Sequence, residues 1–141
     1  MTFSILHRVQ FSETDMAGVV HFSCFFKWME EVEHAYFRSL GLSVAMMHEG
    51  RHIGWPRVTA KCDYTGPVRF EDEIECRLHV TRVGEKSFSY EVTFLKGEQP
   101  VASGAVTSVC CIMENQGGSS ALTAIPIPPD LRHRLGSDTP R

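Results

Sequence analysis

A polar turn runs directly into an apolar helix in the stretch Phe11-Ser12-Glu13-Thr14-Asp15-Met16-Ala17-Gly18-Val19-Val20-His21-Phe22. A helix start leaves its first backbone N–H groups without partners inside the helix, and the helix dipole places about half a positive charge there. Such a site favours a polarised carbonyl oxygen. A turn at Gly18 can fold the carboxylate of Asp15 back beside the same carbonyl. The junction can therefore hold catalytic chemistry.

One long helix follows this turn. From about Ser23 to Leu40, apolar residues recur at spacings of three and four, which predicts a helix with a wide buried face. Ser23 is placed to cap its start and Gly41 to end it. A helix of about 18 residues is roughly 27 Å long, enough to cover one face of a sheet of four or five strands.

Strands are expected on both sides of the helix, because apolar and polar residues alternate there. The first spans Ser4 to Phe11, and a Gly-punctuated connector over Met46 to Gly54 follows the helix. The later strands are expected around residues 57–64, 74–81, 88–94 and 101–113. This order predicts an α+β fold, with an antiparallel sheet of about five strands and one long helix.

Two parts of the chain differ in character. Residues 1–113 are expected to form one folded domain, and residues 114–141 a C-terminal tail. The tail contains Gly117-Gly118-Ser119-Ser120 and the prolines Pro126, Pro128 and Pro129, without apolar periodicity. We therefore expect it to be loosely ordered or draped on the surface.

Composition excludes several classes of function. A net charge of -3 gives no basic field for nucleic acid, and no segment approaches the roughly 20 apolar residues that cross a bilayer. We expect no metal site. Cysteines without a CxxC pair indicate reduced thiols in a cytoplasmic protein. These are Cys24, Cys62, Cys76, Cys110 and Cys111.

The segment Val9 to Phe22, followed by a helix rich in aromatic and acidic residues, resembles the hotdog-fold acyl-CoA thioesterases of the 4-hydroxybenzoyl-CoA thioesterase type. The match lies in Thr14-Asp15-Met16-Ala17-Gly18-Val19-Val20, which fits the T-D-x-x-G-V-V pattern of that family. Asp63-Tyr64-Thr65-Gly66-Pro67-Val68-Arg69-Phe70-Glu71-Asp72-Glu73 is similar to the family's link between its second and third strands. The resemblance covers Phe3 to Met113.

This resemblance implies a fold, an activity and an assembly. The sheet would wrap around the long helix, and dimers, commonly paired into tetramers, would have active sites at the dimer interface. Asp15 would be the catalytic carboxylate, acting either as nucleophile or as general base for water. The Phe22 N–H would hold the thioester oxygen, and Gly18 would shape the loop. The substrate would be an acyl-CoA, or alternatively an acyl carrier protein thioester, and no cofactor is implied.

Physical chemistry supports these roles independently. Thioester hydrolysis needs a nucleophile and a group that stabilises the developing oxyanion, and removing one such donor typically costs about 100- to 1000-fold in rate. A helix N-terminus supplies that donor without a metal. An aspartate is ionised at neutral pH, ready to attack or to orient water.

Other residues near the junction have less certain roles. Relatives with G-V-V-Y-H carry an imidazole two residues after Val-Val, whereas here His21 takes the first position and Phe22 the second. His21 is therefore a minor candidate for a catalytic base, and pocket lining is the favoured interpretation. Glu13 is either a solvated carboxylate or a support for Asp15. Some hotdog thioesterases carry the working carboxylate on the long helix, which makes Glu30 and Glu33 the next candidates.

Several basic residues at strand ends and hairpins could contact coenzyme A phosphates, although each is individually more often a surface charge. They are Arg57, Lys61, Arg69, Arg82 and Lys86. Two alternatives to a thioesterase stay open, since a fold alone does not decide the reaction. One is a non-catalytic acyl-CoA or acyl-lipid binding module. The other is a hydratase or dehydratase, for which His21 would be the nearby imidazole. The sequence does not identify the acyl group.

Overall fold

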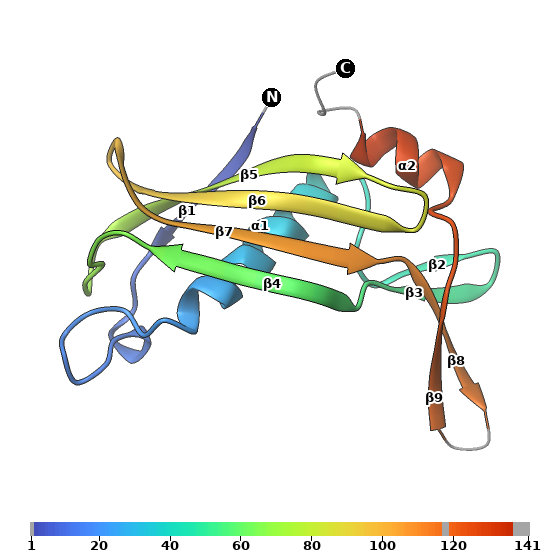
Figure 1. Cartoon of the computed structure of the whole chain (residues 1–141), viewed down its shortest axis with the longest axis horizontal. Coiled ribbons are helices and arrows are strands. Elements are labelled where there is room, and N and C mark those ends of the chain that lie inside the picture. Colours follow the sequence, from blue (N-terminus) through green and yellow to red (C-terminus); the bar gives the residue numbers. More distant parts are fainter. Residues whose placement is uncertain (1, 117–118, 137–141) are drawn as a thin grey trace.

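A five-stranded antiparallel sheet crosses the molecule in the computed structural model, which describes residues 2–116 and 119–136 (Figure 1). The strand order is β1-β5-β6-β7-β4. The strands are β1 (Phe3–Arg8), β4 (Arg57–Tyr64), β5 (Glu73–Val83), β6 (Ser87–Lys96) and β7 (Gln99–Val109). The expected α+β arrangement is confirmed. The first strand is shorter than expected, because Phe11–Glu13 forms a short 3-10 helix, η1.

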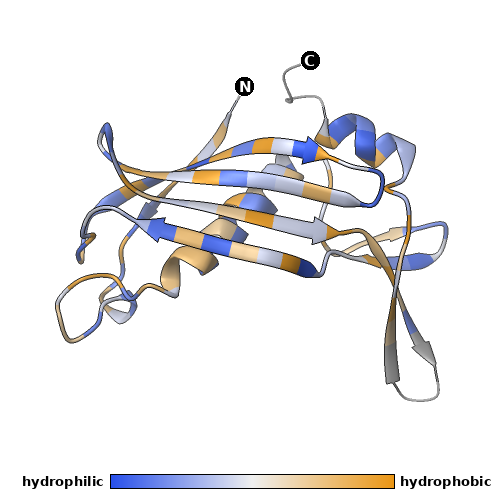
Figure 2. Cartoon of the chain, in the orientation of Figure 1, coloured by the Kyte–Doolittle hydropathy of each residue, from blue (hydrophilic) through white to orange (hydrophobic). Residues whose placement is uncertain are grey.

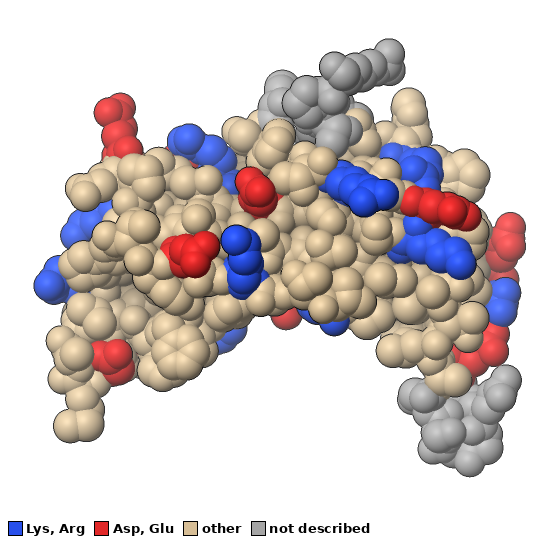
Figure 3. Space-filling model, in the orientation of Figure 1, with Lys and Arg blue, Asp and Glu red and all other residues tan. Residues whose placement is uncertain are grey.

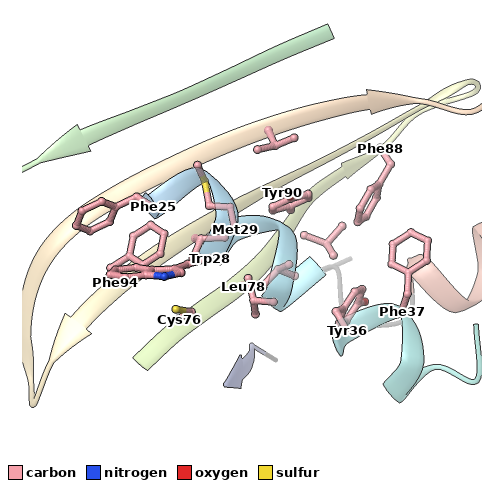
Figure 4. Close-up of a cluster of buried hydrophobic side chains, with 14 of the residues drawn as sticks. Phe25, Trp28, Met29, Tyr36, Phe37, Cys76, Leu78, Phe88, Tyr90 and Phe94 are labelled. Atoms are coloured by element: carbon pink, nitrogen blue, oxygen red, sulfur yellow. The ribbon is translucent and has the colours of Figure 1, made fainter. Parts of the chain in front are cut away.

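The long helix α1 (Cys24–Ser39) lies across the inner face of this sheet. Its buried stripe packs against inward side chains of β5 and β6, and the Phe25 and Phe94 rings lie 5.2 Å apart (Figure 4). The expected helix is confirmed to within one residue at each end, and Gly41 follows it with φ of +76°. Ser23 occupies the N-cap position as expected, but its backbone is already helical and its side chain makes no cap hydrogen bond.

Alternation along the strands places one face of the sheet in the core, as the hydropathy colouring of Figure 2 shows. In β5, Ile74, Cys76, Leu78 and Val80 are all buried. The edge strand β4 differs, since its residues are exposed apart from the partly buried Cys62. One long edge of the sheet is therefore uncovered in the protomer.

A second sheet extends from one end of the first (Figure 1). Its order is β2 (Met46–His48), β3 (Arg51–Gly54), β8 (Cys111–Gln116) and β9 (Ser119–Ala124). The expected connector over 46–54 is thus a short hairpin. The expected strand over 101–113 is interrupted at Cys110, whose N–H donates to the Lys86 carbonyl and whose own carbonyl accepts from Ile125. These bonds direct the chain into the second sheet.

The C-terminal segment corrects the expectation of a loose tail from residue 114. It supplies part of β8, then β9 and helix α2 (Pro129–Leu135). Ile127, Leu131 and Leu135 are buried, and the Arg132 guanidinium donates to the backbone carbonyls of the β5–β6 turn. An apolar side chain every fourth residue anchors the segment, and Pro129 suits a helix start. Residues 117–118 and 137–141 of the expected tail lie outside the described residues.

Candidate active site

The loop before α1 is a tight hairpin that fixes the Asp15 carboxylate. Thr14 and Val20 form an antiparallel bridge, and the Gly18 N–H donates to the Asp15 carbonyl at 3.0 Å. The Asp15 Oδ1 accepts from the Ala17 N–H at 2.8 Å. Asp at the first position and Gly at the last are typical of such turns, and Gly18 has φ of +79°. The local sequence therefore forms a hydrogen-bonded turn that holds this carboxylate in position.

Glu13 anchors the loop to the core. Its buried carboxylate lies 2.7 Å from the Gln10 N–H, 2.8 Å from His7 Nε2 and 2.7 Å from Trp28 Nε1. Burial alone would raise the pKa of Glu13, but these donors outweigh it and hold the pKa below its usual value. The Glu13 carbonyl also accepts from the His21 N–H at 2.8 Å. One residue thus connects β1, the loop and α1.

The start of α1 leaves one backbone donor available. The His21 carbonyl accepts from the Cys24 N–H at 3.0 Å, so the trans peptide directs the Phe22 N–H away from the helix. Among the described residues, no acceptor is found for that N–H. The Tyr64 hydroxyl donates to the Phe22 carbonyl at 2.8 Å. Burial, with Cys62 and Asp63 nearby, raises the pKa of Tyr64 to about 12, so this hydroxyl stays protonated.

Asp15 and Phe22 line the same groove, which has a volume of about 260 Å³. The other walls are mostly apolar and come from the loop, α1 and the segment after β4. They are Val19, Val20, Phe25, Tyr64, Gly66, Pro67 and Val68. The structure therefore brings together the carboxylate and the helix start that the sequence singled out. An acidic side chain in an apolar groove beside a helix N-terminus suits acyl transfer to water.

Comparison with known proteins identifies the family. A family model described as the thioesterase-like superfamily matches residues 9–135. The chain belongs to this superfamily. A 1,4-dihydroxy-2-naphthoyl-CoA hydrolase of Synechococcus sp. (strain CC9605) is 32% identical over 106 residues, which are 72% of this chain and 71% of that protein.

Solved structures agree with this assignment. The structure of a gentisyl-coenzyme A thioesterase is 31% identical, has a TM-score of 0.79, and covers 92% of this chain and 98% of its own. A 1,4-dihydroxy-2-naphthoyl-CoA thioesterase from Synechocystis has a TM-score of 0.80 at 23% identity, with 96% of each chain covered, and shares the fold. The expected hotdog fold and family are confirmed, and the protein is a thioester hydrolase.

His21 does not line the groove of this thioesterase. Its Nδ1 lies 2.7 Å from the Ser23 Oγ and 3.3 Å from the Ser23 N, and its ring lies against the Phe22 ring at 4.5 Å. The imidazole therefore forms hydrogen bonds with the Ser23 side chain and backbone N–H at the exposed start of α1. The lining of the groove in this protomer does not include His21, and a role for His21 in pocket lining or as a base stays a prediction.

The five basic candidates for coenzyme A phosphates are not gathered in the protomer, and Figure 3 shows the Lys and Arg side chains spread over the visible face. Arg57 is bonded to the Glu33 carboxylate and to the Trp55 carbonyl, both at 2.6 Å. Lys61 pairs with Asp63 at 3.7 Å. Arg82 and Lys86 lie at the β5–β6 turn, at the opposite end of the sheet from Asp15 (Figure 1). Arg69 directly follows Val68 of the groove.

Other features of the thioesterase do not suggest a second centre. A larger hollow of about 340 Å³ lies between the second sheet and residues 125–129, and its lining includes none of the predicted site residues. Within residues 2–116 and 119–136, no three His, Cys, Asp or Glu side chains are placed to hold a metal ion. No helix in these ranges is both long and apolar enough to cross a bilayer.

Proposed function

We propose that this thioesterase hydrolyses acyl-CoA thioesters in the groove shared by Asp15 and Phe22. The carbonyl oxygen would accept from the Phe22 N–H, which has no acceptor among the described residues, and the positive end of α1 would stabilise the developing oxyanion. The observation that supports this proposal most is the presence of both groups in one groove.

Asp15 can act by either of two routes. As nucleophile, its carboxylate attacks the thioester carbon, the C–S bond breaks, and water then cleaves the resulting anhydride. As general base, it takes a proton from a water molecule that attacks the same carbon. A single turnover in ¹⁸O-labelled water distinguishes these routes, because only the first can transfer an Asp15 oxygen to the product.

We infer that the acyl group is a compact aromatic one that carries a hydroxyl. The names of two relatives describe such acyl groups, 1,4-dihydroxy-2-naphthoyl and gentisyl. The apolar groove walls, among them Val19, Phe25 and Pro67, suit a ring. Arg69 is placed to meet coenzyme A phosphate, and an acyl carrier protein thioester is the alternative substrate. All five cysteines are free, which suits the reducing cytoplasm.

We further infer that β4 pairs with β4 of a second copy. An uncovered edge strand presents unpaired backbone groups that invite pairing. Large apolar side chains beside this edge are exposed, with Val58 at 59%, Tyr64 at 43% and Phe22 at 62%. Pairing would join two sheets into one and cover the groove, giving a dimer that could pair again into a tetramer.

Replacing Asp15 with Asn tests the catalytic role. We expect thiol release from a panel of acyl-CoA esters to fall at least about 100-fold, with unfolding temperature unchanged, because the carboxylate is exposed. Asp130→Asn, the same change on exposed α2, is the matched control and should keep wild-type rates. Near wild-type turnover by Asp15→Asn would contradict the role. Saturable binding without thiol release by the wild type would favour the non-catalytic binding module.

A further inference from the structure

A seam between α1 and β4 continues from the catalytic groove into the protomer. At one end the Tyr64 hydroxyl of β4 donates to the Phe22 carbonyl, and at the other the Arg57 guanidinium of β4 donates to Glu33 of α1. The two elements therefore run side by side in opposite directions. A helix rises about 1.5 Å per residue, so these two contacts lie roughly 17 Å apart along the axis.

A second pocket of about 140 Å³ lies along this seam. Phe26, Met29 and Glu30 of α1 line it, with Arg57 of β4 and Tyr90 of β6. Phe26 is one helical turn beyond Phe22, so the pocket begins about 6 Å along the helix from the N–H that we assign to the thioester oxygen. Figure 4 shows Met29 and Tyr90 in the space between helix and sheet. The groove and the pocket share no lining residue, but both lie between α1 and β4, so we infer that an acyl group held at Phe22 follows this seam into the pocket.

The far end of the seam is polar and incompletely paired. The Glu33 side chain is 1% exposed, and its Oε1 accepts from Arg57 at 2.6 Å. Its Oε2 is buried without a hydrogen-bond partner among the described residues. A buried carboxylate oxygen without a donor is costly, so a ligand that supplies one gains affinity. Burial, the nearby Glu33 charge and a side-chain hydrogen-bond interaction with the Glu33 carboxylate raise the pKa of Tyr90 well above its usual range, so its hydroxyl stays protonated.

We propose that Glu33, Arg57 and Tyr90, here called the Glu33 cluster, determine specificity by recognising a hydroxyl on the acyl group. The ring would lie between Phe26 and Met29, and its hydroxyl would meet Arg57 and Tyr90 in the pocket wall and reach the Oε2 of Glu33, which does not itself line the pocket. This assignment rests on the proposed function of the groove. It also gives Arg57 a role other than the phosphate contact expected from the sequence.

Charge supports a neutral rather than an anionic acyl terminus. Arg57 is already paired with Glu33, and the carboxylate of Glu30 also lines the pocket. The pocket with its cluster therefore has an excess negative charge. An acyl group that ends in a carboxylate would be repelled, whereas a hydroxyl would be accepted.

The test compares kcat/KM for 4-hydroxybenzoyl-CoA, benzoyl-CoA and succinyl-CoA by thiol release. The wild type should prefer the hydroxylated ester over benzoyl-CoA at least about tenfold, because a site built for a hydroxyl rejects the analogue without it. It should turn over succinyl-CoA more slowly than either. Tyr90→Phe and Glu33→Gln should reduce the hydroxyl preference to near unity, because kcat/KM falls more for 4-hydroxybenzoyl-CoA than for benzoyl-CoA.

Controls keep this test decisive. Glu114→Gln disrupts an exposed ion pair, with Arg51 at 2.7 Å, on the second sheet and should leave the preference intact. If Glu33→Gln does not fold, Arg57→Met, at a side chain 31% exposed, replaces it. Absence of a hydroxyl preference in the wild type, or its survival in every cluster variant, would overturn the proposal.

The outcomes also separate this proposal from the proposed function. Hydrolysis of benzoyl-CoA and 4-hydroxybenzoyl-CoA at equal rates would be consistent with the thioesterase mechanism. It would reject the proposed role of the Glu33 cluster in recognising the hydroxyl. If no ester released thiol, calorimetric binding of 4-hydroxyphenacyl-CoA against phenacyl-CoA, two thioethers that cannot be hydrolysed, would still test the cluster. Equal affinities would then reject it.

Discussion

Single residues determine the geometry of the groove. Asp15 is held by the turn that it begins, through its own Oδ1 and the Ala17 N–H. Glu13 connects this turn to the core through three donors, and Tyr64 fixes the peptide that follows the Phe22 N–H. Fixed positions for acid and donor are what preorganised electrostatic catalysis requires. Substitutions of these supporting residues should therefore affect turnover, although the residues themselves do not contact the substrate.

Glu13→Gln should destabilise the fold and slow turnover. The amide cannot replace a carboxylate that accepts three hydrogen bonds, and we expect a loss of about 2 kcal/mol in the free energy of unfolding. Urea unfolding at pH 7 measures it. Glu31→Gln, an exposed change on α1, should cost far less.

The pH dependence of stability should change in the same variant. Because the pKa of Glu13 is lowered in the folded state, its stabilising effect is complete above its ordinary pKa of about 4.3 and is lost as the pH falls below that value. Urea unfolding from pH 7 to pH 3 should show a shallower decline for Glu13→Gln than for the wild type. Some decline should remain, because the Arg69 N–H and Lys96 also lower the pKa of Asp72 against the effect of burial. Identical slopes would mean that Glu13 does not contribute.

Gly18→Ala should separate backbone strain from catalysis. Gly18 has φ of +79° and no atom within 4 Å of an added Cβ, so the cost is conformational, about 1 kcal/mol. Gly97, with φ of +63° and equally open surroundings in the β6–β7 turn, is the matched control. Both alanine variants should lose similar stability, but only Gly18→Ala should lower kcat/KM. Equal activity of the two variants would show that the Asp15 turn is not critical.

At the scale of elements, α1 and the main sheet follow from apolar periodicity, and the sequence predicted both. The second sheet and α2 did not follow from it. Their strands are short, and the prolines from Pro126 to Pro129 conceal a spacing of four at Ile127, Leu131 and Leu135. Tertiary contacts anchor α2. The Arg132 guanidinium donates hydrogen bonds to the carbonyls of Val83 and Glu85, which are distant in sequence.

Leu135→Ala tests whether α2 belongs to the cooperative fold. Leu135 is 0% exposed, so truncation should leave a cavity and lower the free energy of unfolding by about 2–5 kcal/mol. His133→Ala, on the exposed side of the same helix, should cost little. Chemical denaturation measures both. Equal, small losses would indicate that the helix docks too weakly to matter.

The whole molecule shows what a single sequence can and cannot predict. Asp15, Gly18 and Phe22 were predicted because the turn and helix start are local, and the fold brings Asp15 and Phe22 into one groove. The scattered positions of Lys61, Arg82 and Lys86 and the Glu33–Arg57 pair could not be predicted, because they depend on how distant elements pack. The contact between the His21 ring and the Ser23 hydroxyl was not predicted either.

Pairing through β4 is the prediction that belongs to this scale. Val58→Glu places a charge on the β4 edge at a side chain 59% exposed, so the protomer should fold normally but associate less and lose activity. Leu6→Glu makes the same change on β1, the opposite edge strand, at 65% exposure. Analytical ultracentrifugation should find the β4 variant shifted toward monomer and the β1 variant unchanged. The reverse result would place the interface on the other edge.

The most direct measurement is a crystal structure of the enzyme with 4-hydroxyphenacyl-CoA, whose ketone oxygen stands in for the thioester oxygen. We predict that this oxygen lies about 2.7–3.1 Å from the Phe22 nitrogen, with the Asp15 carboxylate facing the carbonyl carbon. A ketone bound outside the groove, or with its oxygen turned away from Phe22 and its carbon remote from Asp15, would contradict the mechanism.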